Sequence, residues 1–237
     1  MFNTTRRLAL RALLLILPIA LLSACSSLPG ATVEAVGQRQ IEHRLTRQGT
    51  PVVVFENGLG ATLDWWAKVV PALEADTTVL AYNRAGYGRS SPVDTTRDGQ
   101  NVVRELRELL QERGLQPPYV LVGHSLGGLY MQWFARRYPL EVQALVLVDS
   151  THPAQMQGQG APENWPAWVR LAFNAMTNNT AKDELKAIDA TGQSVLGMPS
   201  YTVGPVEVLS ALAPMQDRSN PMSEHGKQLR SSLVNLY

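Results

Sequence analysis

One segment restricts the fold of this chain more than any other: YVLVGHSLGGLYMQWFARRYP, residues 119–139. It begins with an apolar run typical of a buried strand and ends with an apolar helical pattern that Pro139 terminates. Only the five residues GHSLG, 123–127, separate the two patterns. The chain must therefore turn sharply from a strand into a helix, which the small glycines on either side of Ser125 permit.

Strand and helix patterns alternate on both sides of this turn. Apolar runs at 50–58, 77–86 and 142–150 are typical of buried strands, and residues 98–113 place apolar side chains on one face of a predicted helix. Residues 38–49 alternate more weakly, which indicates an edge strand. Strands separated by helices at this spacing favour an α/β fold with a mostly parallel, doubly wound sheet.

The alternation breaks down between residues 151 and 200. This stretch contains Trp165, Trp168 and one predicted helix at 182–190, and it is too long for a simple loop in a compact domain. We expect it to be a lid inserted over a site. A further strand is predicted at 205–211, and a final helix follows it.

The N-terminus has the pattern of a secretory signal. Three arginines within the first 11 residues precede an uncharged apolar run at 12–22, which is short for a transmembrane helix. The run ends in LSAC, residues 22–25, which resembles a bacterial lipobox, whose cysteine becomes the first mature residue and carries lipid. We therefore predict a lipid anchor at Cys25 and a protein of the bacterial cell envelope, facing outside the cytoplasm. The alternative is an ordinary secretory signal with an incidental cysteine.

Length and composition fit a single globular domain behind this leader, with 237 residues of which 45% are hydrophobic. The predicted parts are a signal peptide at 1–24, a tether at 25–37, an α/β core at 38–150, the lid at 151–200 and the remainder of the core at 201–237.

Several function classes are excluded by the same inspection. A formal net charge of +1 gives no basic surface for nucleic acid, and a single cysteine cannot form an internal disulfide. The chain has no metal-ligand spacing, and the glycines of GHSLGG lack the lysine of a phosphate-binding loop. We therefore expect no cofactor and no nucleic-acid partner. Nothing in the sequence indicates an oligomeric state.

Ser125 is the candidate nucleophile. A serine between two glycines at a strand-to-helix turn is exposed above the sheet, and the positive end of the following helix favours the negative charge that develops there. Stabilising that charge takes two backbone N–H groups. The candidates are Leu126, directly after the serine, and Leu59, between two glycines in the loop after the strand at 50–58.

Four segments carry a resemblance to a known family: ENGLGATLDWW, AYNRAGYGRSS, YVLVGHSLGGLYMQWFARRYP and ALVLVDSTHP. In this order they are similar to motifs of the α/β-hydrolase family, strongly over residues 50–153 and weakly over 205–237. Asn83 is a departure, because related sequences often have Asp there. The resemblance implies hydrolysis of a small-molecule acyl substrate, such as a carboxylic ester, through an acyl-enzyme on Ser125. Family members that open epoxides or remove halides use an aspartate nucleophile instead.

The resemblance also implies a triad in the order serine, acid, histidine. Two acids remain open: Asp149, at the end of the strand at 142–150, and Asp217, in the loop after the strand at 205–211. No histidine is a convincing base, because one lies early in the chain, one lies inside the turn, one lies too close to Asp149 and one belongs to the final helix. They are His43, His124, His152 and His225.

The family places its histidine after one more strand, and this sequence ends at Tyr237 without such a strand. We therefore expect the last strand, the last helix and the histidine loop to be absent. The chain could be a fragment, a natural pseudo-enzyme, or an enzyme in which one of the four histidines substitutes. A non-catalytic lipoprotein that keeps the fold as a binding module is the alternative function.

Overall fold

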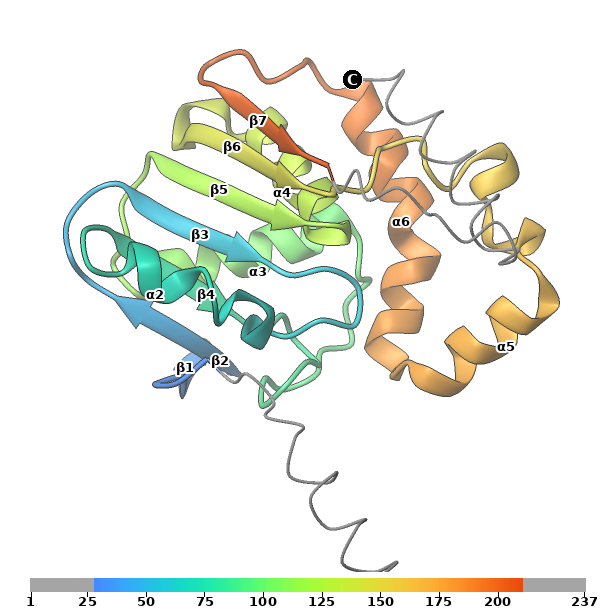
Figure 1. Ribbon diagram of the computed structural model, residues 1–237, viewed down its shortest axis with the longest axis horizontal. Coiled ribbons are helices and arrows are strands. Elements are labelled where there is room, and N and C mark those ends of the chain that lie inside the picture. Colours follow the sequence, from blue (N-terminus) through green and yellow to red (C-terminus); the bar gives the residue numbers. More distant parts are fainter. Residues whose placement is uncertain (1–27, 211–237) are drawn as a thin grey trace, which may run out of the picture.

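The computed structural model describes residues 28–210. Seven strands in this part form one sheet in the order β1-β2-β4-β3-β5-β6-β7 (Figure 1). The strands from β4 to β7 in that order are parallel, while β1 and β2 are antiparallel to their neighbours. The predicted α/β fold with a mostly parallel sheet is confirmed. The strands are β1 (Thr32–Val36), β2 (Arg39–Thr46), β3 (Val52–Glu56), β4 (Thr78–Tyr82), β5 (Tyr119–His124), β6 (Val142–Val148) and β7 (Val206–Leu209).

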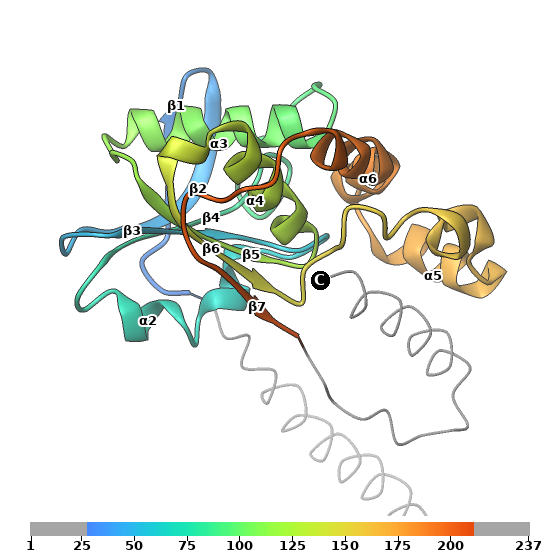
Figure 2. The same ribbon diagram turned by 90° about the horizontal axis from the view of Figure 1, so that it is seen from above.

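Helices cover both faces of the sheet, as the edge-on view in Figure 2 shows. On one face lie α3 (Gly99–Glu112) and α4 (Leu126–Arg137), and on the other lie the short helices η1 (Leu63–Trp66) and α2 (Val70–Leu73). Alternate residues of a strand point to opposite faces. Accordingly, Val54 packs in the core beneath α3 and α4, and Phe55 packs in the core beneath η1.

The N-terminal part of the described chain corrects two predictions. Residues 32–36 of the predicted tether form β1, which pairs with β2 across a turn where Gly37 has a φ of +56°. The predicted edge strand, β2, therefore lies inside the sheet, between β1 and β4. Backbone pairing explains both differences, because it stabilises a short, mostly exposed strand whose side chains gave little periodic signal. Val36, at the end of β1, is nevertheless fully buried.

The segment at 151–200 contains two main helices, α5 (Ala167–Met176) and α6 (Asn179–Gly197). The predicted helix at 182–190 is the central part of α6, whereas α5 was not predicted. In Figure 1 both helices lie beyond the carboxyl ends of the strands. Side chains of α4 hold α6 there, because Trp133 Nε1 donates to Ser194 Oγ (3.0 Å) and Arg136 donates to the carbonyl of Val195 (3.1 Å).

Three of the predicted features lie outside the described residues: Cys25 with its signal segment, Asp217, and His225 with the final helix. Within residues 28–210, none of the helices combines the length and the apolar character that crossing a membrane requires.

Candidate active site

Ser125 occupies the sharp turn between β5 and α4. Its backbone has φ 52° and ψ −122°, which is a strained conformation for a residue with a side chain. Backbone hydrogen bonds hold it in place, because its N–H donates to Val148 O (3.1 Å) and its carbonyl accepts from Thr151 N–H (2.9 Å). Although Ser125 is the N-cap of α4, its hydroxyl makes no capping hydrogen bond, so the hydroxyl remains available for chemistry.

Two glycines make this turn possible by allowing backbone segments to touch. A Cβ atom on Gly123 would lie 2.6 Å from the Cα of Gly128, and one on Gly127 would lie 2.5 Å from the carbonyl oxygen of Asn57. Neither position has room for a side chain. The pattern read from the sequence, small residues on both sides of the serine, therefore has a steric cause in the structure.

The loop after β3 lies against the nucleophile. A Cβ atom on Gly58 would be 3.2 Å from the Cβ of Ser125, and Gly60 has a φ of +74°. Within the described part of the chain, the amides of Leu59 and Leu126 make no hydrogen bond to another residue. Leu126 is the first residue of α4, where a helix leaves its N–H groups unpaired. The two predicted oxyanion amides are thus brought to the same end of the sheet as Ser125.

A buried side chain that the sequence analysis did not single out fixes this loop. Asn57 is 1% exposed; its Nδ2 donates to Tyr82 O (2.7 Å) and its Oδ1 accepts from Trp66 Nε1 (2.7 Å). Trp66 also packs on Phe55, with ring centroids 4.7 Å apart. Trp66 therefore belongs to the core and supports the loop. In the sequence, only the position of Asn57 directly after a predicted buried strand could have indicated this role.

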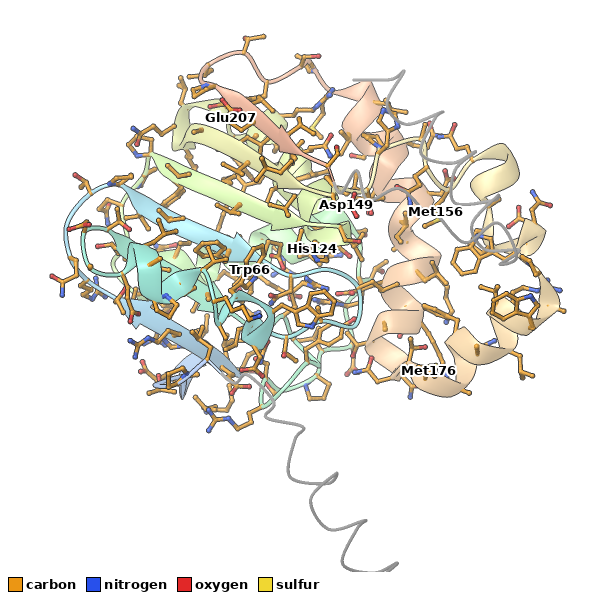
Figure 3. All side chains as sticks on the ribbon, viewed as in Figure 1. Trp66, His124, Asp149, Met156, Met176 and Glu207 are labelled. Atoms are coloured by element: carbon orange, nitrogen blue, oxygen red, sulfur yellow. The ribbon has the colours of Figure 1, made fainter. Side chains whose placement is uncertain are left out.

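Asp149 follows β6 at the same edge of the sheet, and Figure 3 shows it close to His124 at the end of β5. Its φ of 44° is unusual for a residue other than glycine, and its N–H donates to Leu209 O (2.7 Å). The side chain is exposed. Burial lowers the pKa of His124, and the negative charge of Asp149 opposes this shift without reversing it.

The three described histidines do not form a triad with Ser125. His43 lies on β2, away from the site, and its Nδ1 contacts Ile41 O (3.2 Å). His124 stacks on Trp65 at 5.3 Å, and its buried Nδ1 has no hydrogen-bond partner among the described residues. The Nδ1 of His152 accepts from Ala154 N–H (3.1 Å). Burial lowers the pKa of all three side chains.

The two tryptophans of the 151–200 segment differ in their surroundings. Trp165 is partly buried; its Nε1 donates to Gly160 O (3.0 Å) and its ring contacts that of Phe173 (6.1 Å). Trp168, on α5, is 56% exposed. The rest of α5 is similar, since none of its residues is buried although most are apolar.

Known proteins are similar to this chain in sequence and in fold. The sequence profile of the alpha/beta hydrolase fold matches residues 51–231. A human (lyso)-N-acylphosphatidylethanolamine lipase is 31% identical over 138 residues, which are 54% of this chain and 38% of the lipase. A rat 1-acylglycerol-3-phosphate O-acyltransferase is 30% identical over 132 residues, 54% of this chain and 37% of that protein. The match thus spans well under half the length of either relative.

A solved marine microorganism esterase superposes with a TM-score of 0.51 and 17% identity, over 72% of this chain and 80% of the esterase. At that identity the likeness concerns the fold alone. The sequence profile, by contrast, covers most of the chain, including β3, the turn at Ser125 and β7. This chain belongs to the alpha/beta hydrolase fold family.

Proposed function

We propose that the protein is a serine hydrolase that cleaves small carboxylic esters through an acyl-enzyme on Ser125, and that Cys25 anchors it by lipid to a bacterial membrane. One observation carries the first part: a strained serine whose hydroxyl does not cap its own helix, beside two amides without partners among the described residues. A structural serine in this position would stabilise more by capping α4.

Ester hydrolysis would take two steps, acylation of Ser125 and hydrolysis of the acyl-enzyme. The Ser125 oxygen attacks the ester carbonyl carbon while a general base removes its proton, and the alcohol leaves with a proton returned by that base. Water then attacks the acyl-enzyme in the same way and releases the acid. The N–H groups of Leu59 and Leu126 hold the carbonyl oxygen while it carries negative charge.

Ser125 is the proposed nucleophile, and Asp149 and Asp217 are the two candidates for the triad acid. Asp149 is at the end of the sheet that carries Ser125, which supports it as the acid, while Asp217 lies outside the described residues. The surroundings of His43, His124 and His152 favour structural roles for these side chains. The kcat of Asp149→Asn and of Asp217→Asn on the same ester separates the two acids. Replacing the triad acid should lower kcat by several orders of magnitude, and replacing the other should not.

Ester turnover tests the proposal directly. The full-length gene product is assayed with p-nitrophenyl esters of two to eight acyl carbons, beside Ser125→Ala and Ser150→Ala as a matched serine control. We expect turnover in the wild type and in Ser150→Ala, and its loss by several orders of magnitude in Ser125→Ala. Unchanged turnover in Ser125→Ala would refute the assignment of the nucleophile.

Metabolic labelling with a lipid precursor tests the membrane anchor. The precursor should enter the wild-type protein and not Cys25→Ala, because no other cysteine is present in the chain. Label that persists in Cys25→Ala would contradict the anchor. A folded wild-type protein that binds esters without turnover would instead favour the alternative, a lipid-anchored binding module with the same fold.

A further inference from the structure

The most deeply buried charges of the described chain lie directly behind the candidate active site. Arg84, after β4, has a side chain that is 1% exposed, and its partners Glu56 and Glu184 are 0% exposed. Arg84 is 2.6 Å from Glu56, on β3, and 2.7 Å from Glu184, on α6. Breaking a buried ion pair by removing one partner is costly, so this cluster ties α6 firmly to the sheet.

The guanidinium of Arg84 also binds the loop that carries Leu59. Its Nη1 donates to Asn57 O (2.5 Å) and its Nη2 donates to Gly58 O (2.9 Å). Three further bonds go to the two carboxylates. A guanidinium has five N–H donors in a rigid plane, and here they make five hydrogen bonds. Two of these five bonds depend on Glu184.

These bonds determine where the Leu59 amide points. In a trans peptide the carbonyl and the following N–H point in opposite directions. Because the Gly58 carbonyl points to Arg84, the N–H of Leu59 points away from Arg84, and Gly58 itself lies against Ser125. Tyr87 also connects the loop to Glu184. Its hydroxyl accepts from Gly60 N–H (3.3 Å) and donates to Glu184 (2.7 Å).

We infer that Glu184 is a positioning residue for the oxyanion hole, so that docking of α6 and the direction of the Leu59 amide are coupled through Arg84 and Tyr87. This inference rests on the proposed function for its catalytic consequence, but the coupling itself is a property of the fold. A helix of the segment over the site thereby helps to complete the catalytic arrangement. When α6 is displaced, the loop loses the restraint that keeps Leu59 N–H available to the substrate oxygen.

The test compares Glu184→Gln and Tyr87→Phe with Glu105→Gln. The last variant is the matched control, because Glu105 pairs with Arg97 in another buried ion pair that does not contact the loop. Hydrogen exchange is measured in peptides that span residues 55–63. In parallel, the rate constant and the affinity of inactivation by a fluorophosphonate are measured separately for each variant.

We expect both test variants to speed exchange in residues 57–60 more than elsewhere. They should also lower the inactivation rate constant, by about tenfold to a hundredfold in Glu184→Gln, with affinity little changed. Glu105→Gln should leave both readouts in the loop near wild type. If Glu184→Gln does not fold, Tyr87→Phe decides, because it removes a hydroxyl and leaves the ion pairs in place.

Two results would overturn the inference. Exchange in residues 57–60 that is unchanged in a folded Glu184→Gln or Tyr87→Phe variant contradicts the coupling. Faster exchange with an unchanged inactivation rate constant contradicts the positioning role. A wild-type protein that does not react at all refutes the proposed function instead, and the exchange measurement then decides the coupling by itself.

Discussion

Gly123 and Gly128 touch through their backbones at the turn that carries Ser125, so the turn depends on the absence of side chains there. In Gly123→Ala, the added Cβ would meet backbone atoms at 2.6–2.7 Å, which no side-chain rotation can relieve. We expect the free energy of unfolding to fall by about 1–3 kcal/mol. Urea denaturation measures this loss.

Gly197→Ala is the matched control for this prediction. Gly197 lies at the end of α6, and a Cβ atom there would meet nothing within 4 Å. The free energy of unfolding of Gly197→Ala should equal or slightly exceed that of the wild type. A Gly123→Ala variant as stable as Gly197→Ala would contradict the packing at the turn.

His43 makes the stability depend on pH. Burial lowers its pKa below the usual 6.5, so the unfolded chain binds the proton more tightly than the folded protein. The neutral folded form is fully stable above pH 6.5, and stability falls as the pH drops from there through the lower folded pKa. The difference in unfolding free energy between wild type and His43→Gln should therefore shrink between pH 7.5 and pH 5. A constant difference would contradict a buried neutral His43.

Asn83 shows how a single residue can depart from the family pattern without loss of its contacts. Its Oδ1 accepts from Leu63 N–H (2.7 Å) and its Nδ2 donates to Glu42 (2.8 Å). An aspartate at this position would place a second carboxylate against Glu42 and could not donate. Asparagine at this position therefore suits the buried Glu42, a partner that lies 41 residues away and that no local pattern indicates.

At the scale of elements, α3 and α4 begin differently. The side chain of Asp98 caps α3 by accepting from Asn101 N–H (2.9 Å), whereas Ser125 leaves α4 uncapped. Asp98→Ala should therefore lower the unfolding free energy by about 1 kcal/mol, and Ser125→Ala should change it much less. Thermal unfolding of both variants checks this. An equal loss in the two variants would mean that the Ser125 hydroxyl supports the helix.

Elements with strong periodic signals were predicted well from the sequence. Helix α3 was expected at 98–113 and spans Gly99–Glu112, and a strand was expected at 205–211 where β7 spans Val206–Leu209. The sequence predicts a tether where β1 forms, because this strand is only five residues long and mostly exposed, and its stability comes from pairing with β2. Helix α5 is a difference from the prediction, and its mostly apolar residues are not buried against the rest of the described chain.

The whole molecule brings together residues that are far apart in the sequence. The turn at 123–127 and the loop at 57–60 could be read as a site because each carries a local glycine pattern. Their connection to Glu184 could not be predicted from the sequence. Glu184 binds Arg84 across 100 residues, and such a contact leaves no trace in local spacing. The sheet supplies this relation, because the carboxyl ends of β3, β4 and β5 lie side by side and α6 packs beyond them (Figure 1).

The central claim is that Ser125 is an activated nucleophile, and peptide mass spectrometry after reaction with a fluorophosphonate tests it most directly. The account predicts one adduct per chain, located on Ser125 within residues 119–137, and no adduct in Ser125→Ala. A folded wild-type protein that forms no adduct, or an adduct that persists in Ser125→Ala, would contradict the account.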